Sequence, residues 1–431
     1  MNHFQPKKGV LHAEAVALPA LAKAYGTPLY VYSRATLTRH WQVLHRSLAG
    51  LDHTVCYAVK ANSNLAVLAT FAELGSGFDI VSAGELYRVM KAGGEPRKVV
   101  YSGVGKRDDE IAFALDAGVG TLNVESAPEL ARVAAVARRL KVRAPVALRV
   151  NPDVDPKTHP YIATGLREAK FGVAVPDARR LYHEAVKDPH LDVRGVACHI
   201  GSQITTLRPF VDAVGRVRKL AEDLGRAGIR LRHLDVGGGL GVTYKDETPP
   251  SPAEYGAAIR KALDGWEGEV HLEPGRVLVG NAGVLVTRVL YVKESGKKTF
   301  VVVDAAMNDL VRPSFYDAWH EIEPVVAPRR GTKAVKADVV GPVCESSDFL
   351  ARDRRLPLPA EGDLLCVRTA GAYGFTMSSN YNSRPRAAEV LVDGDRALLA
   401  RERETYPDLV RGEEPRPRAR RFQGRRSLDA G

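Results

Sequence analysis

The sequence predicts an α/β fold: a (β/α)8 TIM barrel joined to a C-terminal domain of mainly β structure, of the β-sandwich or barrel-like kind. Three observations lead to this prediction. Short apolar segments alternate with amphipathic ones along the first part of the chain, and this alternation stops near residue 280. The segments beyond that point have the composition of strands separated by turns.

Eight segments rich in β-branched and other apolar residues are expected to form the parallel strands of the barrel. They are residues 54–59, 77–81, 98–101, 120–124, 145–150, 193–200, 231–236 and 269–273. A doubly wound open sheet is the alternative, because hydrophobic periodicity does not show whether a sheet closes on itself.

The segments between these strands have apolar residues three or four positions apart, which places them on one face of a helix. They span residues 65–74, 84–92, 108–117, 127–140, 177–186, 209–227 and 253–263. Two of them begin with a serine that is followed three residues later by a glutamate, Ser126 with Glu129 and Ser251 with Glu254. This spacing predicts a capping box at each of these helix starts.

The second domain is expected to be discontinuous. Its predicted strands are residues 284–291, 299–303, 338–340, 363–367 and 389–392, and the strand-like run at 29–33 is expected to join them. The predicted domains are the barrel at 35–280, the β domain at 1–34 and 281–410, and a tail at 411–431. The tail holds seven arginines and few apolar residues, so we expect it to be disordered.

Composition narrows the class of protein. The chain has 431 residues, 45% hydrophobic and 26% charged, which is an ordinary globular balance. Its net charge of +11 is compatible with nucleic acid or acidic small molecules, and charge alone does not choose between them. The four cysteines lie far apart without CxxC spacing, which indicates neither a zinc site nor a disulfide framework and favours a reducing cytoplasm. No apolar run reaches about 18 residues, so no membrane span is expected.

A barrel of this kind places its active site at the carboxyl ends of the strands. The residues that end the predicted strands are polar or glycine, which predicts a functional site at that end. They are Lys60, Ser82, Ser102, Glu125, Asn151, His199, Gly237, Gly238, Gly239 and Glu273.

Two of these features suggest covalent chemistry and phosphate binding. Lys60 ends an apolar strand, so we expect a partly desolvated amine with a lowered pKa, which favours Schiff-base formation. The loop at 235–241 is rich in glycine, and its N–H groups can approach a phosphate closely because no Cβ obstructs them. Taken alone, the lysine could be a solvated strand end and the loop a flexible turn.

Two other residues suggest contacts with an aromatic ring. Glu273 could hold a proton on a ring nitrogen, and His199 could stack on the ring, although a turn salt bridge and a structural histidine are the plainer interpretations. Ser202 could bond a phosphate. An amine, a phosphate cradle, a stacking imidazole and a partner for a ring nitrogen together indicate pyridoxal phosphate chemistry.

A series of motifs along almost the whole chain resembles the diaminopimelate decarboxylases, a family in the alanine-racemase-like barrel class of pyridoxal-phosphate enzymes. The motifs are YAVKAN at 57–62, FDIVSAGEL at 78–86, NPDVDPKTHPYIATG at 151–165, KFG at 170–172, HIGSQ at 199–203, DVGGGLG at 235–241, EPGR at 273–276, RPSFYDAWH at 312–320, GPVCESSDF at 341–349 and GAYGFTMSSNYNSRPRAAEV at 371–390. The tail after about residue 411 lies outside this resemblance.

The resemblance implies a role for each matching residue. Lys60 would form the Schiff base with pyridoxal 5'-phosphate, His199 would stack on its ring, and Glu273 would pair with the ring nitrogen. The residues around the phosphate or close to it would be Ser202, Gly238, Gly239, Gly275 and Arg276, and Arg276 would also reach the substrate. No metal is implied.

The resemblance also implies a substrate site that is completed by a second subunit. Arg312 and Tyr316 would bind the distal carboxylate of diaminopimelate, and Glu345 its distal ammonium. Tyr373 would contact both cofactor and substrate. Cys344 would be the general acid, reaching the cofactor from the partner subunit of a homodimer whose active sites are shared at the interface.

The implied reaction is decarboxylation of meso-2,6-diaminopimelate to L-lysine and CO₂, the last step of lysine biosynthesis. A related decarboxylase for D-lysine, ornithine, arginine or carboxynorspermidine is one alternative. A non-catalytic protein that binds pyridoxal phosphate is an alternative from another class, and nucleic-acid binding through the basic surface is a third.

The segment at 155–170 is expected to be a mobile loop over the active site.

Overall fold

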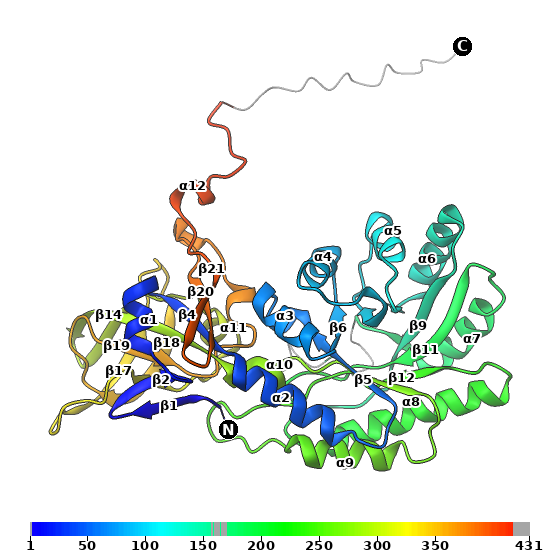
Figure 1. The fold of residues 1–431 in the computed structure, drawn as a ribbon, viewed down its shortest axis with the longest axis horizontal. Helices are drawn as coiled ribbons and strands as arrows, with labels where there is room; N and C mark the ends of the chain where they lie inside the picture. The colour runs from blue at the N-terminus through cyan, green and yellow to red at the C-terminus, as the bar shows by residue number, and fades with distance from the viewer. Residues whose placement is uncertain (1, 157, 159–163, 165–169, 417–431) are drawn as a thin grey trace.

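The protein is described here by a computed structural model, which covers residues 2–156, 158, 164 and 170–416. Its barrel and its β domain lie at opposite ends of the long axis of the molecule (Figure 1). Most of the loop at 155–170, expected over the active site, lies outside the described residues, and so do residues 417–431 of the tail.

The eight predicted strands form a closed parallel barrel. They are β5 (His53–Ala58), β6 (Gly77–Ile80), β7 (Val99–Tyr101), β8 (Thr121–Val124), β9 (Ala144–Asn151), β11 (Leu191–Ala197), β12 (His233–Asp235) and β13 (Glu269–Leu272). Their order is β9-β11-β12-β13-β5-β6-β7-β8, and β8 pairs with β9 to close the circle. The short strand β10 (Val173–Ala174) adds to β9. Closure confirms the barrel and excludes the open sheet.

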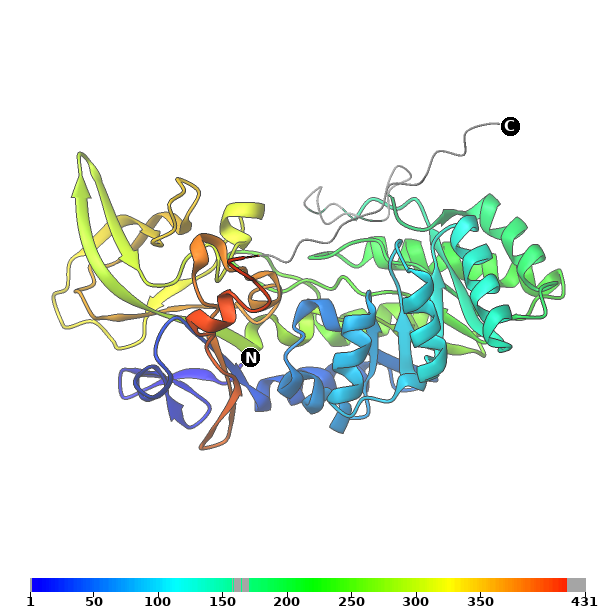
Figure 2. The same cartoon turned by 90° about the horizontal axis from the view of Figure 1, so that it is seen from above.

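Helices cover the outside of these strands (Figures 1 and 2). Those expected from the sequence are α3 (Leu65–Glu73), α4 (Ala83–Lys91), α5 (Asp108–Ala117), α6 (Ala127–Leu140), α7 (Val175–Ala185), α8 (Arg208–Arg226) and α9 (Pro252–Ala262). Helix α2 (Arg34–Ser47) was not predicted; it precedes the first barrel strand and packs against both α3 and α9. Its buried residues Leu37, Trp41 and Leu44 have the helical spacing that could have revealed it.

One of the two predicted capping boxes is present in full. The Ser251 hydroxyl accepts the N–H of Glu254, and the Glu254 carboxylate accepts the N–H of Ser251 at 2.8 Å. The Ser126 hydroxyl likewise accepts the N–H of Glu129, at 3.2 Å. The reciprocal half of this second box is absent, because the Glu129 carboxylate accepts the N–H of Glu125 and pairs with Lys106 instead.

The second domain consists mainly of β structure, as predicted. Its larger sheet contains β4 (Leu29–Ser33), β14 (Gly283–Ser295), β15 (Lys298–Val303), β16 (Ile322–Pro324), β17 (Ala334–Val340), β18 (Phe349–Pro357), β19 (Leu364–Val367), β20 (Ala388–Asp393) and β21 (Arg396–Arg401). Strand β4 lies between β14 and β20, so an early segment of the chain is a central strand of this sheet. The exact limits of the domains stay a prediction.

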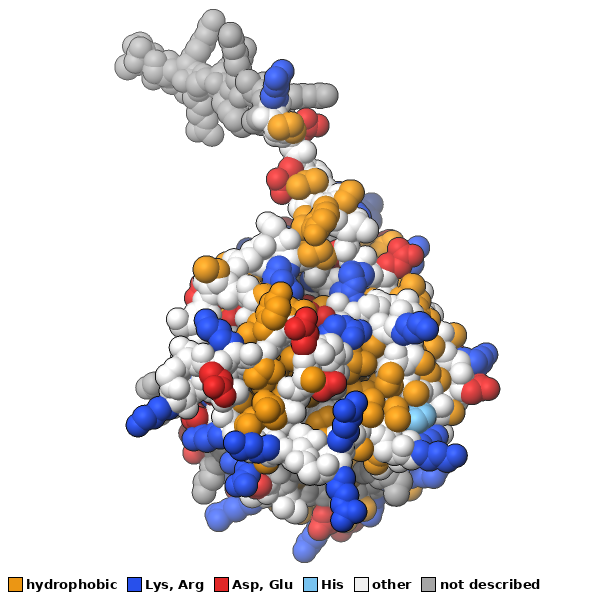
Figure 3. Space-filling model, turned by 90° about the vertical axis from the view of Figure 1, so that its left-hand side faces the viewer, with side chains coloured by type: hydrophobic (Ala, Val, Ile, Leu, Met, Phe, Trp, Pro, Cys, Tyr) orange, Lys and Arg blue, Asp and Glu red, His pale blue; other side chains and the backbone are white. Residues whose placement is uncertain are grey.

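Strands β10, β16, β18 and β21 were not predicted from the sequence. The remaining helices and strands are short and were not predicted either. They are β1 (Phe4–Lys7), β2 (Val10–Ala13) and β3 (Val16–Ala17) of a small sheet, and the helices α1 (Leu18–Tyr25), α10 (Arg276–Val279), α11 (Arg312–Tyr316) and α12 (Tyr406–Leu409). Within the described part of the chain, no helix has both the length and the apolar composition that crossing a bilayer requires. On the β-domain face seen in Figure 3, lysine and arginine side chains are scattered among apolar and acidic ones.

A buried ion pair between Lys106 and Glu129 holds the loop between β7 and α5 in place. The Lys106 ammonium is 2.7 Å from the Glu129 carboxylate, and it donates to the carbonyls of Gly103 and Asn123 at the same distance. Lys106 is 4% exposed and Glu129 7%. Burial lowers the pKa of Lys106, and the charge of Glu129 opposes this effect. The pair is therefore a structural contact between this loop and helix α6, with little access to water.

We expect Lys106→Met to lower the free energy of unfolding by about 3–5 kcal/mol, because it leaves the Glu129 carboxylate buried without its cation. Lys336→Met is the matched control: Lys336 pairs with Asp353 at the surface, where both side chains are more than half exposed, and its loss should cost at most about 1 kcal/mol. Urea denaturation followed by circular dichroism measures both. Equal shifts in the two variants would contradict a structural role for the buried pair.

Candidate active site

A cavity of about 470 Å³ opens at the carboxyl ends of the barrel strands, on the side that faces the β domain. Residues from both parts of the chain line it. They include Lys60, His199, Ser202, Tyr244, Arg276, Arg312, Tyr316 and Tyr373. The barrel mouth predicted from the sequence is therefore a real cavity, and most of the predicted site residues face it.

Lys60 lies in the single 3-10 turn Val59–Ala61 that follows β5. Its ammonium forms an ion pair with Asp79, a fully buried residue of β6. Burial by itself lowers the pKa of Lys60, but the carboxylates of Asp79 and Glu273 outweigh burial and hold the pKa above its ordinary value. The expectation of a lowered pKa is therefore wrong for this lysine, because the sequence did not show that two carboxylates converge on it.

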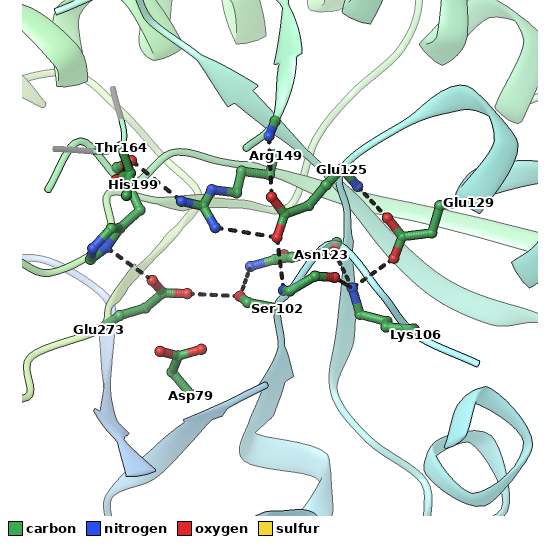
Figure 4. Close-up of polar contacts among 12 residues, drawn as sticks. Asp79, Ser102, Lys106, Asn123, Glu125, Glu129, Arg149, Thr164, His199 and Glu273 are labelled. Carbon is green, nitrogen blue, oxygen red and sulfur yellow. Dashed lines mark hydrogen bonds and ion pairs between the residues drawn. The ribbon is translucent and has the colours of Figure 1, made fainter. Parts of the chain in front are cut away.

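Glu273 follows β13 and is 5% exposed. Its carboxylate accepts the Ser102 hydroxyl at 3.3 Å and lies 3.5 Å from Nδ1 of His199 (Figure 4). Burial raises the pKa of Glu273, but the hydrogen bond and charge of His199, together with the charges of Lys60 and Arg149, bring it to about 2. This carboxyl group therefore stays ionised at neutral pH.

Two neighbouring carboxyl groups behave in the opposite way. Burial and the charge of Glu273 raise the pKa of Asp79 to about 7, although Lys60 opposes the shift. Burial and Glu273 also raise the pKa of Asp235 above its ordinary value. Three acidic groups close together do not ionise equally easily, and Glu273 is the one that loses its proton most readily.

His199 lies just beyond β11, at the rim of the cavity. The backbone N–H of Gly238 donates to its Nδ1 at 3.1 Å. Burial lowers the pKa of the imidazole, while the hydrogen bond and charge of Glu273 act to raise it. Because Nδ1 accepts the N–H of Gly238, this hydrogen bond orients the ring, and the Glu273 carboxylate lies beside the same nitrogen at 3.5 Å.

The glycines after β12 are needed for close packing of backbone. A Cβ on Gly238 would lie 2.0 Å from the carbonyl oxygen of Glu273, and one on Gly237 would lie 2.4 Å from that of Cys198. The loops after β11, β12 and β13 can therefore approach one another only with glycine at these positions. Among the described residues, the N–H groups of Gly239 and Gly275 have no hydrogen-bond acceptor, so they remain available to an anion.

Two arginines at the starts of short helices enter the cavity. Arg276 begins α10 and donates to the Ser202 hydroxyl at 3.0 Å, and Arg312 begins α11. They are 7% and 6% exposed, and neither guanidinium has a carboxylate within ion-pair distance in the described part of the chain. Both instead donate to the hydroxyl of Tyr244. Tyr244 was missed because it lies in an irregular loop with no motif that marks it.

Tyr373 belongs to this cavity as well. Its N–H donates to the carbonyl of Ala61, next to Lys60, and the Arg276 guanidinium lies 4.8 Å from the centre of its ring. Cys344 and Glu345 do not line the cavity: both are exposed, the N–H of Cys344 donates to Asn382, and Glu345 accepts the hydroxyl of Tyr381. One chain thus brings together all the predicted side chains of the site except these two.

A second polar network supports the site from the side of β8 and β9 (Figure 4). The guanidinium of Arg149 pairs with Glu125 at 3.2 Å and contacts the carbonyl of His199 at 3.5 Å. Glu125 also accepts the N–H groups of Gly103 and Gly172. The sequence marked Glu125 as a strand end but missed Arg149, because an arginine inside a buried strand gives no periodic signal.

The groups around the cavity fit pyridoxal phosphate. They supply an amine at Lys60, an ionised carboxylate at Glu273, and, for an anion, the Ser202 hydroxyl, the Arg276 guanidinium and the N–H groups of Gly239 and Gly275. This set of donors suits a phosphate, an aldehyde and a basic ring nitrogen. The described residues hold no group of three or more His, Cys, Asp and Glu side chains suited to a metal ion.

Comparison with known proteins agrees with this geometry. Residues 34–280 match the family model described as pyridoxal-dependent decarboxylase, pyridoxal binding domain. The diaminopimelate decarboxylase of Vibrio cholerae is 57% identical over 411 residues, which cover 95% of this chain and 98% of that protein. The enzyme of the same name from Pseudomonas aeruginosa is 56% identical over 417 residues, covering 96% and 99%.

Solved structures show the same similarity. Diaminopimelate decarboxylase from M. jannaschii, in complex with L-lysine, has a TM-score of 0.91 at 36% identity and covers 96% of this chain and 99% of its own. The Helicobacter pylori enzyme with L-lysine has a TM-score of 0.88 at 42% identity, covering 91% and 98%. From its fold, its cavity and these similarities, the chain belongs to the pyridoxal-dependent decarboxylases and, within them, to the diaminopimelate decarboxylase family.

Proposed function

We propose that this protein decarboxylates meso-2,6-diaminopimelate to L-lysine and CO₂, the last step of lysine biosynthesis, with pyridoxal 5'-phosphate as cofactor. One observation carries the choice of substrate. The cavity that contains Lys60 also contains two buried guanidiniums, Arg276 and Arg312, without carboxylate partners among the described residues. A substrate with a second carboxylate at its far end supplies the missing negative charge.

The residues that hold the cofactor follow from the donor set. Lys60 would provide the amine that binds the cofactor, and Ser202, Gly238, Gly239, Gly275 and Arg276 would surround its phosphate. When bound, pyridoxal phosphate supplies a carbonyl that condenses with amines and a ring that accepts the electron pair released as the α-carboxylate leaves as CO₂.

Glu273 and His199 would contact different parts of the cofactor ring: Glu273 its nitrogen and His199 its face. Because its pKa is about 2, Glu273 is a carboxylate at neutral pH and holds a proton at the ring nitrogen. A protonated ring withdraws electrons more strongly, which favours decarboxylation. His199, oriented by the N–H of Gly238, would cover the face of the ring.

The far end of the substrate is bound by residues of the β domain. Arg312 and Tyr316, both in α11, bind the distal carboxylate, and Tyr373 contacts both cofactor and substrate. Glu345 binds the distal ammonium. Together these groups match both charges of a zwitterionic substrate end.

We further propose a homodimer in which Cys344 and Glu345 of each chain complete the site of the other. Their exposure, and their position outside the lining of their own chain's cavity, support this arrangement. Cys344 then donates the proton that replaces CO₂ on the α-carbon.

All four cysteines are free thiols, which supports a cytoplasmic location.

The alternatives account for fewer of these residues. The substrates of the related decarboxylases are D-lysine, ornithine, arginine and carboxynorspermidine. None of them carries a second carboxylate that could bind Arg312. The lysine/ornithine decarboxylase of Vibrio vulnificus, complexed with cadaverine, shares the fold at 24% identity and a TM-score of 0.77. A non-catalytic carrier of pyridoxal phosphate would not need an ionised partner for the ring nitrogen.

The direct test is CO₂ release by the purified enzyme, loaded with pyridoxal phosphate, from meso-diaminopimelate and from D-lysine, ornithine, arginine and carboxynorspermidine. We expect release from diaminopimelate. Lys60→Ala should lose both the activity and the visible absorbance band of the bound cofactor, because it lacks the amine that holds the cofactor. Release from another substrate alone would reject the substrate assignment.

We expect Glu273→Gln to lower kcat by about a hundredfold or more, because a neutral amide does not hold a proton at the ring nitrogen. The KM for diaminopimelate should change little. Glu269→Gln is the matched control, since Glu269 lies at the other end of the same strand. Steady-state kinetics and the cofactor absorbance spectrum report the effect, and an unchanged kcat in Glu273→Gln would refute this role.

Mixing of two inactive variants tests the shared site. Lys60→Ala and Cys344→Ala are each expected to be inactive, but a mixed dimer has one site with both residues intact. After subunit exchange at equal concentrations, the activity should return to about a quarter of the wild-type value. Continued inactivity after exchange has been shown by mass spectrometry would contradict the shared site.

A further inference from the structure

Tyr244 occupies an unusual place between two buried arginines. Its hydroxyl oxygen accepts hydrogen bonds from Nη1 of Arg276 at 2.7 Å and from Nη1 of Arg312 at 2.5 Å. The two guanidiniums also lie 5.7 Å and 4.5 Å from the centre of its ring. Tyr244 is 8% exposed and lines the same cavity as Lys60. One phenol thus bridges two like charges that would otherwise repel each other.

The position of Arg312 depends on this phenol. Within the described residues, the hydroxyl of Tyr244 is the one hydrogen-bond acceptor of the Arg312 side chain. Arg276 is held more firmly, since it also donates to Ser202 and lies over the ring of Tyr373. Loss of the Tyr244 hydroxyl therefore releases Arg312 more than Arg276.

The hydroxyl proton of Tyr244 is available to a ligand. A phenol oxygen has two lone pairs and one proton, and the two arginines occupy both lone pairs. No acceptor for the proton is present among the residues that the structure describes. An anionic oxygen in the cavity can therefore receive one hydrogen bond from Tyr244 beside those from the guanidiniums.

We propose that Tyr244 is a specificity-determining residue, which holds Arg312 in place and, with both arginines, selects substrates that carry a carboxylate at the end far from the reacting carbon. This inference rests on the proposed function and deepens it. Because the contact is made at the far end of the substrate, Tyr244 acts on affinity more than on the rate of bond breaking.

The charged surroundings of Tyr244 add a dependence on pH. Burial raises the pKa of its phenol, but Arg276 and Arg312 outweigh burial and leave the pKa below its ordinary value. The other groups around it change this balance little: His320, whose ring centre is 5.3 Å away, has a pKa of about 3 because of burial and Arg312, and Glu247 accepts the backbone N–H of Tyr244. Tyr373 faces Arg276 from the opposite side.

Ionisation of the phenol should weaken the binding of a carboxylate. A phenolate neutralises part of the charge of the two guanidiniums and has no proton to donate, so affinity for the distal carboxylate falls as pH rises through the phenol's pKa. A phenylalanine at position 244 cannot ionise and therefore lacks this alkaline decline. A purely structural role for the ring would leave the two pH profiles parallel.

The test compares two ligands on the holoenzyme by isothermal titration calorimetry. L-Lysine keeps the far carboxylate, whereas cadaverine lacks it. We expect Tyr244→Phe to weaken L-lysine binding about tenfold or more at neutral pH, the loss typical of a hydrogen bond to a charged group. Cadaverine binding should stay within about twofold. Tyr182→Phe is the matched control, since it removes a buried hydroxyl bonded to Gly195 outside the cavity.

Each outcome decides between definite alternatives. Selective loss of L-lysine affinity in Tyr244→Phe, together with loss of the alkaline decline seen in the wild type, supports the proposal. Unchanged L-lysine affinity, or equal weakening of both ligands, overturns it. If the wild-type holoenzyme itself neither binds L-lysine nor releases CO₂ from diaminopimelate, the proposed function fails rather than the role of Tyr244.

Discussion

Closure of the parallel barrel is the constraint on which the rest of the structure depends. When β8 pairs with β9, all eight strands end on one rim, so the residues that follow them must share a small space. Lys60, Glu273 and His199 are far apart in the sequence and become neighbours for this reason alone. The glycines after β12 then allow the rim loops to approach to backbone contact, which side chains at those positions would prevent.

Several ionisable side chains lie close together at the rim of the barrel, so their charges must be balanced. Asp79, Asp235 and Glu273 share their surroundings with Lys60, and their pKa values separate, so that Glu273 keeps its charge while its neighbours hold protons more readily. Beside them, Lys106 with Glu129 and Arg149 with Glu125 form compensated pairs. Arg276 and Arg312 have no such carboxylate among the residues that the structure describes, and this uncompensated charge distinguishes a ligand site from the structural ion pairs around it.

The β domain contributes to the site as well as to stability. It carries Arg312, Tyr316 and Tyr373 to the cavity, while the barrel carries the lysine and the acidic groups. Strand β4 and helix α2 connect the two parts, since β4 is central in the β-domain sheet and α2 completes the ring of barrel helices directly after it. The reacting end of a ligand can thus lie over the barrel and its far end against the β domain.

The sequence by itself determined the alternation of strands and helices, the position of Lys60, His199 and Glu273 at strand ends, and the change to β structure near residue 280. These features are local, because periodicity and turn residues record which side of each segment is buried. The pKa values and contacts that depend on residues far apart in the sequence were decided only by the tertiary structure. It raised the pKa of Lys60 through Asp79 and Glu273, brought Arg149 to the backbone carbonyl of His199, and put Tyr244 between two arginines. It also left Cys344 outside the cavity of its own chain, because electrostatics and side-chain contacts depend on proximity in space, which no local pattern encodes.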